Sequence, residues 1–261
     1  MLGGGVLRVS LLSVTPVKSL AVHHPDHLDL SDEGVVGDRA FFVVDEELGL
    51  VSCTDVGDLL RYRAAFDQAT GVLDVHGPDG SVRSAAVELG EAVATDFYGL
   101  RTVDGHVVLG WEELFSGIAG RPARLVKGSS GGFDVCGVTL LGAPTVKELA
   151  ARNQADPVDP RRFRMNIEIS GGEALDEDRW EGRRLRMGSA VVKVGGPVRR
   201  CAATTRNPDT GDVDLKTLQM IGRFRGRQET EQFGAGFYLG VYAEVVAPGR
   251  VAVGDEVSVA A

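Results

Sequence analysis

Cys201 stands in the stretch of the chain whose residue types are best suited to chemistry. Two arginines, Arg199 and Arg200, precede it, and two hydroxyl side chains, Thr204 and Thr205, follow shortly after. Nearby guanidinium groups favour the thiolate over the thiol, and a thiolate is the form that attacks electrophiles or binds a soft metal. The stretch therefore predicts a reactive or metal-binding cysteine.

The segment after Cys201 indicates where this thiol lies in the fold. Residues 207–211, Asn-Pro-Asp-Thr-Gly, have the composition of a tight turn, because proline presets φ and glycine relieves strain. A cysteine just before such a turn lies near the end of a strand, where functional sites are commonly built. The alternative is a small buried hydrophobe, since free cysteine is among the most buried residue types.

The composition limits the possible function classes. The chain has 261 residues, enough for one large or two modest domains, and its net charge of −9 argues against a general nucleic-acid-binding protein. Cys53, Cys136 and Cys201 form no CxxC pair, so a zinc ribbon or redox dithiol is not supported. No stretch reaches the roughly 18 apolar residues of a membrane helix. The odd cysteine count and the lack of a signal peptide predict a cytoplasmic protein. From the net charge and the missing apolar stretch we expect neither nucleic-acid nor membrane partners.

The five histidines all lie in the first 106 residues, far from Cys201 in the sequence. A Cys-His hydrolase is therefore disfavoured, although a fold can bring distant residues together. The cluster at 23–27 could bind a metal, but Pro25 interrupts it and its spacing matches no helical i, i+4 pair. A solvated loop is the preferred interpretation of this cluster.

Short β-rich runs bounded by Gly, Pro or Asp dominate the chain, and helical periodicity is scarce. The predicted strands are 6–12, 41–45, 71–76, 124–127, 167–170, 190–195, 238–246 and 251–260. We expect the longest helix at 145–153, where Thr145 and Glu148 have capping-box spacing, and weaker helices at 112–118 and 215–221. The pattern predicts a mainly β protein with a few helices, built from closed or packed antiparallel sheets.

The run 128–132, Gly-Ser-Ser-Gly-Gly, has the composition of a linker and divides the chain almost in half. We predict one domain over 1–127 and a second over 133–261. The alternative is a surface loop inside a single domain.

Six segments, in the expected order, together resemble the MOSC family, named for the C-terminal domain of molybdenum-cofactor sulfurase. They are 15–19 (TPVKS), 37–41 (GDRAF), 162–167 (RFRMNI), 177–180 (EDRW), 200–205 (RCAATT) with the turn at 209–211, and 240–242 with 253–257 (GVY, VGDEV). The likeness is to the two-domain branch, which includes the mitochondrial amidoxime-reducing component and bacterial reductases of N-hydroxylated compounds. It implies an N-terminal β-barrel-like domain over 1–127 and a C-terminal MOSC β-barrel domain over 133–261.

The resemblance also implies the site residues. Cys201 would be the catalytic residue and the thiolate ligand of molybdenum in a bound molybdenum cofactor (Mo-molybdopterin). The pterin or its phosphate would be held by Lys18, Ser19, Arg39 and Arg164, with Asn166, Thr204 and Thr205 nearby. The residue types agree, because a phosphate is bound well by arginine forks, a lysine charge and hydroxyl donors, and a thiolate suits a soft metal site.

The activity implied by the resemblance is molybdenum-dependent reduction of N-hydroxylated small molecules, with electrons from a separate electron-transfer protein. A second possibility is a sulfur or molybdenum-cofactor carrier without turnover, in which a PLP-dependent desulfurase supplies a persulfide to Cys201. A third is a structural member of the family that binds nothing.

Three positions depart from the family pattern. The segment 51–55 lacks the arginine of a T-x-R motif, Cys136 replaces a position that is often His or Tyr, and Arg206 stands where an apolar residue is common. These departures bear on the substrate class more than on cofactor binding.

Overall fold

The fold comes from a computed structural model, which describes residues 5–260. Its α-helices are α1 (Glu112–Ala119), α2 (Ala143–Arg152) and α3 (Thr217–Arg225), and its 3-10 helices are η1 (Gly57–Arg61), η2 (Pro160–Phe163), η3 (Asp176–Trp180) and η4 (Ala202–Thr205). Its strands up to the middle of the chain are β1 (Leu7–Leu12), β2 (His27–Ser31), β3 (Gly34–Val35), β4 (Phe41–Val44), β5 (Leu50–Val51), β6 (Arg63–Asp67), β7 (Val72–His76), β8 (Val82–Ala86), β9 (Leu89–Phe97), β10 (Arg101–Val108) and β11 (Arg124–Gly128). The later strands are β12 (Val138–Gly142), β13 (Ile167–Ser170), β14 (Arg184–Met187), β15 (Ala190–Arg199), β16 (Gln228–Thr230), β17 (Gly234–Gly236), β18 (Tyr238–Ala247), β19 (Gly249–Ala252) and β20 (Glu256–Val259).

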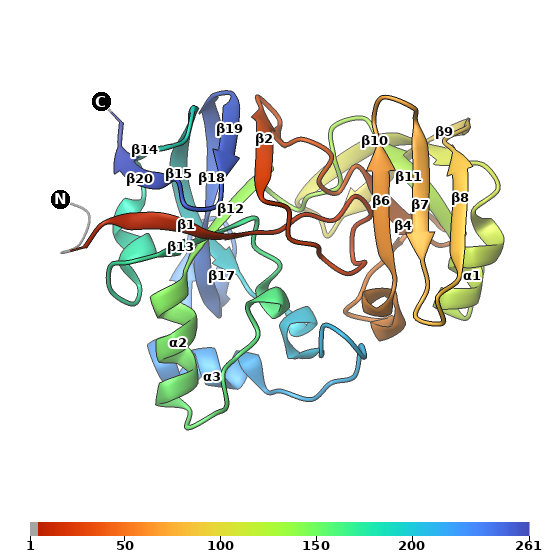
Figure 1. Ribbon diagram of the computed structural model, residues 1–261. Helices are drawn as coiled ribbons and strands as arrows, with labels where there is room; N and C mark the ends of the chain where they lie inside the picture. The colour runs from red at the N-terminus through yellow and green to blue at the C-terminus, as the bar shows by residue number, and fades with distance from the viewer. Residues whose placement is uncertain (1–4, 261) are drawn as a thin grey trace.

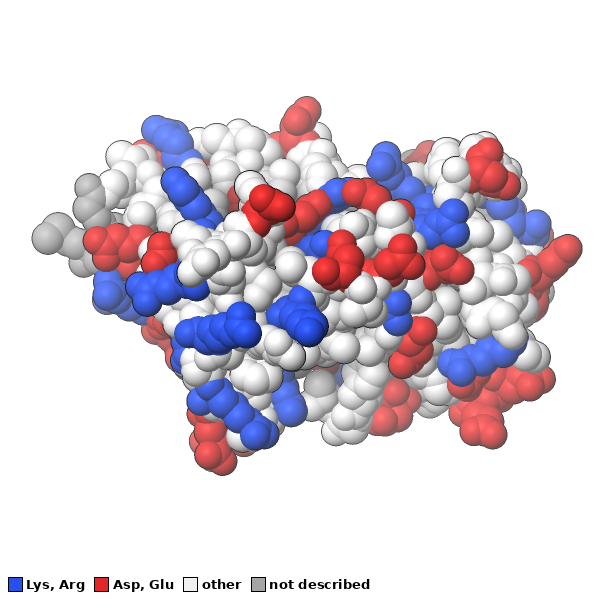
Figure 2. All heavy atoms as spheres, turned by 90° about the horizontal axis from the view of Figure 1, so that it is seen from below, with Lys and Arg blue, Asp and Glu red and all other residues white. Residues whose placement is uncertain are grey.

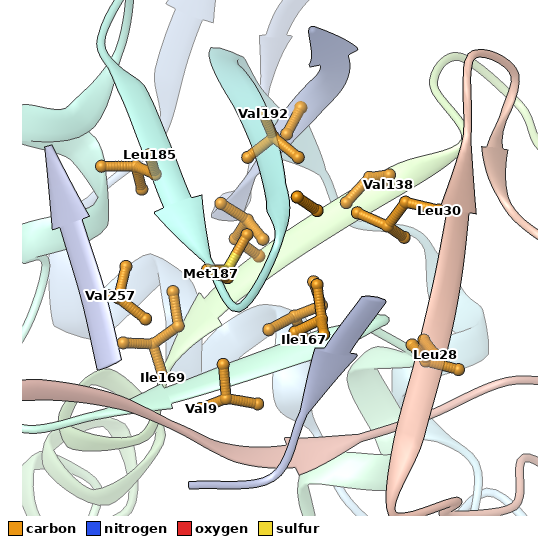
Figure 3. Packing of buried hydrophobic residues seen from close by; sticks show 14 of the residues in the cluster. Val9, Leu28, Leu30, Val138, Ile167, Ile169, Leu185, Met187, Val192 and Val257 are labelled. Carbon is orange, nitrogen blue, oxygen red and sulfur yellow. The ribbon is translucent and has the colours of Figure 1, made fainter. Parts of the chain in front are cut away.

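A closed barrel forms the half of the molecule drawn on the left of Figure 1, with the strand order β1-β13-β12-β18-β15-β14-β20. Its strands alternate in burial, as a period-two sequence requires: Ile167 and Ile169 of β13 point inward, whereas Glu168 between them is partly exposed. The inward side chains fill the barrel. Figure 3 shows Val9, Ile169 and Val257 close together there, although Val9 and Val257 come from opposite ends of the chain.

A second core lies between two separate sheets in the other half of the molecule. One sheet has the order β5-β4-β11-β10-β9 and the other the order β6-β7-β8. Phe41 and Leu125 from the first sheet pack with Leu73 from the second and with Trp111 and Phe115 at helix α1. The expected mainly β fold with few helices is confirmed. In this half the barrel-like unit takes the form of two facing sheets, whose pairing within residues 5–260 does not close into one cylinder.

The predicted division into 1–127 and 133–261 stays a prediction, and the sheet pairing crosses it. Strand β1 pairs with β13 and β20 in the barrel, and β2 pairs with β19. The linker candidate also begins inside a strand, because β11 extends through Gly128. Residues 1–4 and 261 of the predicted domains lie outside the described residues.

Two details of the sequence prediction are corrected. Helix α2 begins at Ala143 with Gly142 as N-cap, so Thr145 is not the cap of a capping box. The Thr145 hydroxyl instead donates to Glu177 (2.8 Å) and accepts from the Leu175 amide (2.8 Å). The run 251–260 is split between β19 and β20, because Gly254 turns the chain with φ of 93°. Within residues 5–260, none of the helices has the length and apolar character needed to cross a bilayer.

Candidate functional site

A cavity opens between the two sheets of the first half and the barrel of the second. Its lining comes from eight separate segments and includes Lys18, Ser19, Arg39, Ser52, Cys53, Thr54, Tyr98, Phe133, Asp134, Val135, Cys136, Thr139, Arg162, Phe163, Arg164, Met165, Val198, Arg199, Arg200, Cys201, Ala203, Thr204 and Tyr242. Lysine and arginine side chains far outnumber carboxylates in this set. The cavity is therefore suited to an anionic ligand.

Main-chain hydrogen bonds bring the first two motifs of the chain together at this cavity. The amide of Arg39 donates to the carbonyl of Thr15 (2.7 Å), and the amide of Lys18 donates to the carbonyl of Phe41 (2.7 Å). The two segments therefore run side by side. Lys18 and Arg39 then reach the same cavity although 20 residues separate them along the chain.

Four cavity residues have a left-handed backbone conformation that side chains other than glycine rarely adopt. They are Ser19 (φ 73°), Arg39 (φ 49°), Tyr98 (φ 59°) and Arg164 (φ 54°). Such conformations are unfavourable and persist where the surrounding structure imposes them, as it commonly does at functional sites. Their concentration at one cavity supports a functional role for it.

Asp38 joins the two halves beneath the cavity. Its Oδ1 accepts from the Thr15 amide (2.8 Å), and its Oδ2 accepts from Asn166 Nδ2 (2.9 Å) and from the Arg39 guanidinium. Arg39 Nη2 also donates to the Arg164 carbonyl (2.9 Å). Asp38 therefore fixes the direction of Arg39 and couples it to the segment that carries Arg164.

Arg164 and Arg200 are two half-buried cations of the site whose hydrogen-bond partners are uncharged. Within residues 5–260 neither contacts a carboxylate: Arg164 Nη2 donates to the Leu20 carbonyl (2.7 Å), and Arg200 donates to the Phe163 carbonyl and lies 3.2 Å from the Met165 sulfur. Burial lowers the pKa of both guanidinium groups from the ordinary value. A buried positive charge without a counter-ion is unfavourable unless a ligand supplies the negative charge.

Cys201 lies at the end of β15, immediately before η4, and its side chain is exposed to the cavity. Thr204 fixes the main chain here, because its hydroxyl donates to the Cys201 carbonyl (3.0 Å) and contacts the Thr217 hydroxyl at the start of α3 (2.7 Å). From the opposite half, Thr54 Oγ1 lies 4.0 Å from Cys201 Sγ. The thiol is thus presented by the barrel and bordered by the first half of the chain.

Arg206 holds this border in place. Its Nη2 donates to the Thr54 carbonyl (2.6 Å) and its Nη1 to the Gly211 carbonyl (2.8 Å). The halves touch directly beside it, where a Cβ on Gly57 would lie 2.2 Å from the Gly211 oxygen. Only glycine fits such a close approach of two main chains.

The structure brings most of the predicted site residues to the cavity: Lys18, Ser19, Arg39, Arg164, Cys201 and Thr204. Asn166 and Thr205 do not line it. Asn166 is buried below and bonds Asp38, Ser13 and Thr139, whereas the Thr205 hydroxyl donates to the Ala202 carbonyl (2.6 Å). The geometry supports a positioning role for Asn166, which holds Asp38 and, through it, Arg39.

Other cavity residues were not singled out from the sequence as ligand-binding. Burial raises the pKa of Tyr98 to about 12 and that of Cys136 to about 11, and it also raises the pKa of Tyr242. These three groups are therefore protonated at neutral pH. Tyr98 comes from the β9–β10 turn and Tyr242 from β18, and no local sequence signal joins these elements to the cysteine.

The donor set fits an anionic cofactor that carries its own metal ligands. Among the described residues, no group of three or more His, Cys, Asp or Glu side chains is arranged to hold a metal ion, so the cavity offers one thiol with many cations. Arg200 Nε is buried and has no hydrogen-bond partner within residues 5–260, which leaves a donor for a ligand. On the face shown in Figure 2, in contrast, acidic and basic side chains are interspersed.

Comparisons with known proteins show what the chain is similar to. Residues 133–258 match the MOSC domain family. The chain is 25% identical over 267 residues to molybdenum cofactor sulfurase of Oryza sativa subsp. japonica, with 85% of this chain and 31% of that protein covered. It is 32% identical over 127 residues to mitochondrial amidoxime reducing component 2 of Homo sapiens, with 48% of this chain and 37% of that protein covered.

A solved structure, that of the YuaD protein from Bacillus subtilis, is also similar, with a TM-score of 0.46 and 14% identity over 97% of this chain and 94% of that chain. The chain spans only about a third of the length of the curated relatives named above, 31% and 37%.

Proposed function

Because residues 133–258 of this chain match the MOSC domain family, we propose that it is a molybdenum-cofactor-dependent reductase of N-hydroxylated small molecules. The proposed reaction converts R–NHOH, two electrons and two protons into R–NH2 and water. A separate electron-transfer protein would supply the electrons. The free thiols of Cys53, Cys136 and Cys201 support a reducing, cytoplasmic setting for this activity.

The observation that carries the proposal is the coincidence of an exposed thiol with a cavity of incompletely neutralised cations. Cys201 would provide a thiolate ligand to the metal. Lys18, Arg39 and Arg164 would hold the anionic part of the cofactor through charge-assisted hydrogen bonds. The relatives named for molybdenum cofactor sulfurase and for an amidoxime reducing component support the choice of cofactor and of substrate class.

The residues of this chain would bind and orient, and the bound cofactor would supply the two-electron redox chemistry. Thr204 holds the Cys201 main chain, and Asp38 holds the Arg39 side chain. Tyr98 and Tyr242 line the cavity and would offer phenol donors to a polar substrate.

A second candidate function is transfer of sulfur by a persulfide on Cys201, supplied by a PLP-dependent desulfurase. The exposure of Cys201 favours this candidate, since a carrier thiol must be reached by a partner protein. So does the similarity to molybdenum cofactor sulfurase over 85% of this chain.

Metal analysis and one cysteine substitution test the proposal. The chain should be produced in a host that makes the cofactor, with molybdenum, pterin fluorescence and bound sulfane sulfur measured. We expect molybdenum near one per chain, and reduction of N-hydroxylated test substrates with reduced viologen. Cys201→Ser should abolish this activity, because the hydroxyl is a hard and largely protonated donor.

Cys53→Ser and Cys136→Ser are the controls and should retain most of the activity. Bound sulfane sulfur without molybdenum would favour the sulfur-carrier function. A chain that holds neither sulfane sulfur nor molybdenum would support a purely structural role. Full activity of Cys201→Ser with molybdenum retained would exclude the ligand role.

A further inference from the structure

Asp134 is the only carboxylate among the described residues that line the cavity. Its Oδ1 lies 2.6 Å from Lys18 Nζ, and Lys18 Nζ also donates to the Gly132 carbonyl (3.0 Å). The Lys18 side chain is 11% exposed and that of Asp134 is 45% exposed. A rim residue from the segment that joins the two halves therefore reaches in and neutralises the lysine.

Three other cations of the cavity show how the Lys18–Asp134 contact affects ligand binding. Arg39 keeps its own carboxylate, Asp38, below the cavity, whereas Arg164 and Arg200 have carbonyl and sulfur partners. A ligand can therefore approach these two arginines without displacing a charge. At Lys18, an anion must either displace Asp134 or lie beside it, and two negative charges a few ångströms apart repel each other strongly in a partly buried site.

We propose that Asp134 is a specificity-determining residue of this anion site. Its carboxylate occupies Lys18 and so disfavours small anions such as inorganic phosphate. A larger anionic ligand that also reaches Arg164 and Arg200 offsets the lost ion pair through these further contacts. The inference rests on the proposed function for the identity of the larger ligand, but inorganic phosphate tests it without any cofactor.

The position of Asp134 makes this exchange feasible. Because the side chain is nearly half exposed, its carboxylate can turn to water when an anion takes its place, and no unpaired charge is left buried. Asp134 thus acts as a removable counter-ion, in contrast to the buried Asp38.

The opposite role for Asp134 predicts the opposite result. If its carboxylate only orients Lys18 toward the ligand, its loss weakens anion binding. If it excludes small anions, its loss strengthens their binding. The sign of the change in phosphate affinity therefore decides between the two roles.

The experiment is a calorimetric titration of inorganic phosphate onto the cofactor-free full chain, as wild type, Asp134→Asn and Asp104→Asn. Asp104 is an exposed carboxylate on β10 outside the cavity, so its variant controls for the change in net charge. We expect Asp134→Asn to bind phosphate about tenfold more tightly and Asp104→Asn to match the wild type. Asp134→Ser should reproduce the gain, which makes the result independent of one substitution.

The double variant Lys18→Met, Asp134→Asn should lose the gain, because the repulsion acts at Lys18. Unchanged or weaker phosphate affinity in both Asp134 variants would overturn the inference, as would a gain that persists without Lys18. Molybdenum content is measured separately on the same variants, so that failure to load the cofactor would count against the proposed function and leave the phosphate result standing.

Discussion

Arg162 and Arg164 are separated by one residue, yet they have different kinds of partner. Arg162 makes a forked contact with both carboxylate oxygens of Asp214 (2.7 and 2.8 Å) and donates to the Arg206 carbonyl (2.7 Å). Arg164 lines the cavity and donates a hydrogen bond to the carbonyl of Leu20. The first arginine is satisfied within the chain, and the second retains binding capacity.

This difference teaches that one basic motif can combine an arginine paired with a carboxylate and an arginine bonded only to a carbonyl. The backbone explains how two positions so near in sequence diverge: η2 ends at Phe163, and Arg164 takes a left-handed conformation that turns its side chain away from that of Arg162. The partner group, a carboxylate or a carbonyl, then tells the two roles apart.

The largest expected effect is on ligand binding by Arg164→Ala. The variant should contain at most about one tenth of the molybdenum of the wild type, because the proposed charge-assisted contact to the cofactor is lost. Its free energy of unfolding should change by less than about 1 kcal/mol, since the buried charge that is removed had no carboxylate partner. Molybdenum analysis and urea denaturation measure the two quantities. An undiminished molybdenum content would contradict a ligand-binding role for Arg164.

Arg162→Ala should show the reverse pattern, a loss of stability. We expect a decrease of about 1–3 kcal/mol in the free energy of unfolding, less than for a fully buried pair because Asp214 is 38% exposed. Arg162→Lys keeps the charge but not the fork and should lie between this variant and the wild type. Urea denaturation measures all three proteins, and equal stability would contradict a structural role.

A smaller loss is expected at the border between the halves. Arg206→Ala removes the bonds to the Thr54 and Gly211 carbonyls and should destabilise the chain by about 1–2 kcal/mol. The backbone amides of residues 53–58 should exchange hydrogen faster, because this segment loses its bond to Arg206. Arg61→Ala on the neighbouring η1, where the ion pair with Asp58 is exposed, is the control and should change neither quantity measurably.

The smallest expected effect is a pH dependence of the Arg162 contact. Arg162 holds the pKa of Asp214 below its ordinary value, so the pair contributes stability above the pKa of the unfolded chain, near 4. This contribution should disappear as pH falls through the lower pKa of the folded state. Denaturation of wild type and Asp214→Asn between pH 3 and 7 should give curves that converge at low pH. The exposed Asp212→Asn serves as control, and parallel curves would argue against the ion pair.

Much of the barrel could be predicted because its strands have clear local signals. Residues 167–170 alternate Ile-Glu-Ile-Ser, and the structure places β13 over the same four residues. Strand β9 gave no such signal, since most of its residues are exposed and its small and polar side chains do not alternate with apolar ones. Its place in the sheet depends on β10, which a local pattern cannot show.

The site divides in a similar way. Cys201 and the arginines before it stand out by type, and the resemblance named Lys18, Arg39 and Arg164. Asp134 and Tyr98 did not stand out, because an aspartate and a tyrosine in polar segments are ordinary. They reach the cavity only through the packing of one half against the other. Arg206 was noticed as a departure, but its part in holding Thr54 follows from contacts across 152 residues of chain.

The position of β1 in the barrel means that the barrel can close only after nearly the whole chain has been synthesised. In the barrel β1 lies between β13 and β20, with Leu7 opposite Val257, so the ribosome delivers one partner of this pair near the start and the other near the end. At about 5–20 residues per second, roughly 10–50 s separate them. During that interval β1 presents an unpaired edge, which is prone to pair with other chains. A fragment limited to residues 133–258 would lack β1 and leave β13 and β20 open at the same gap.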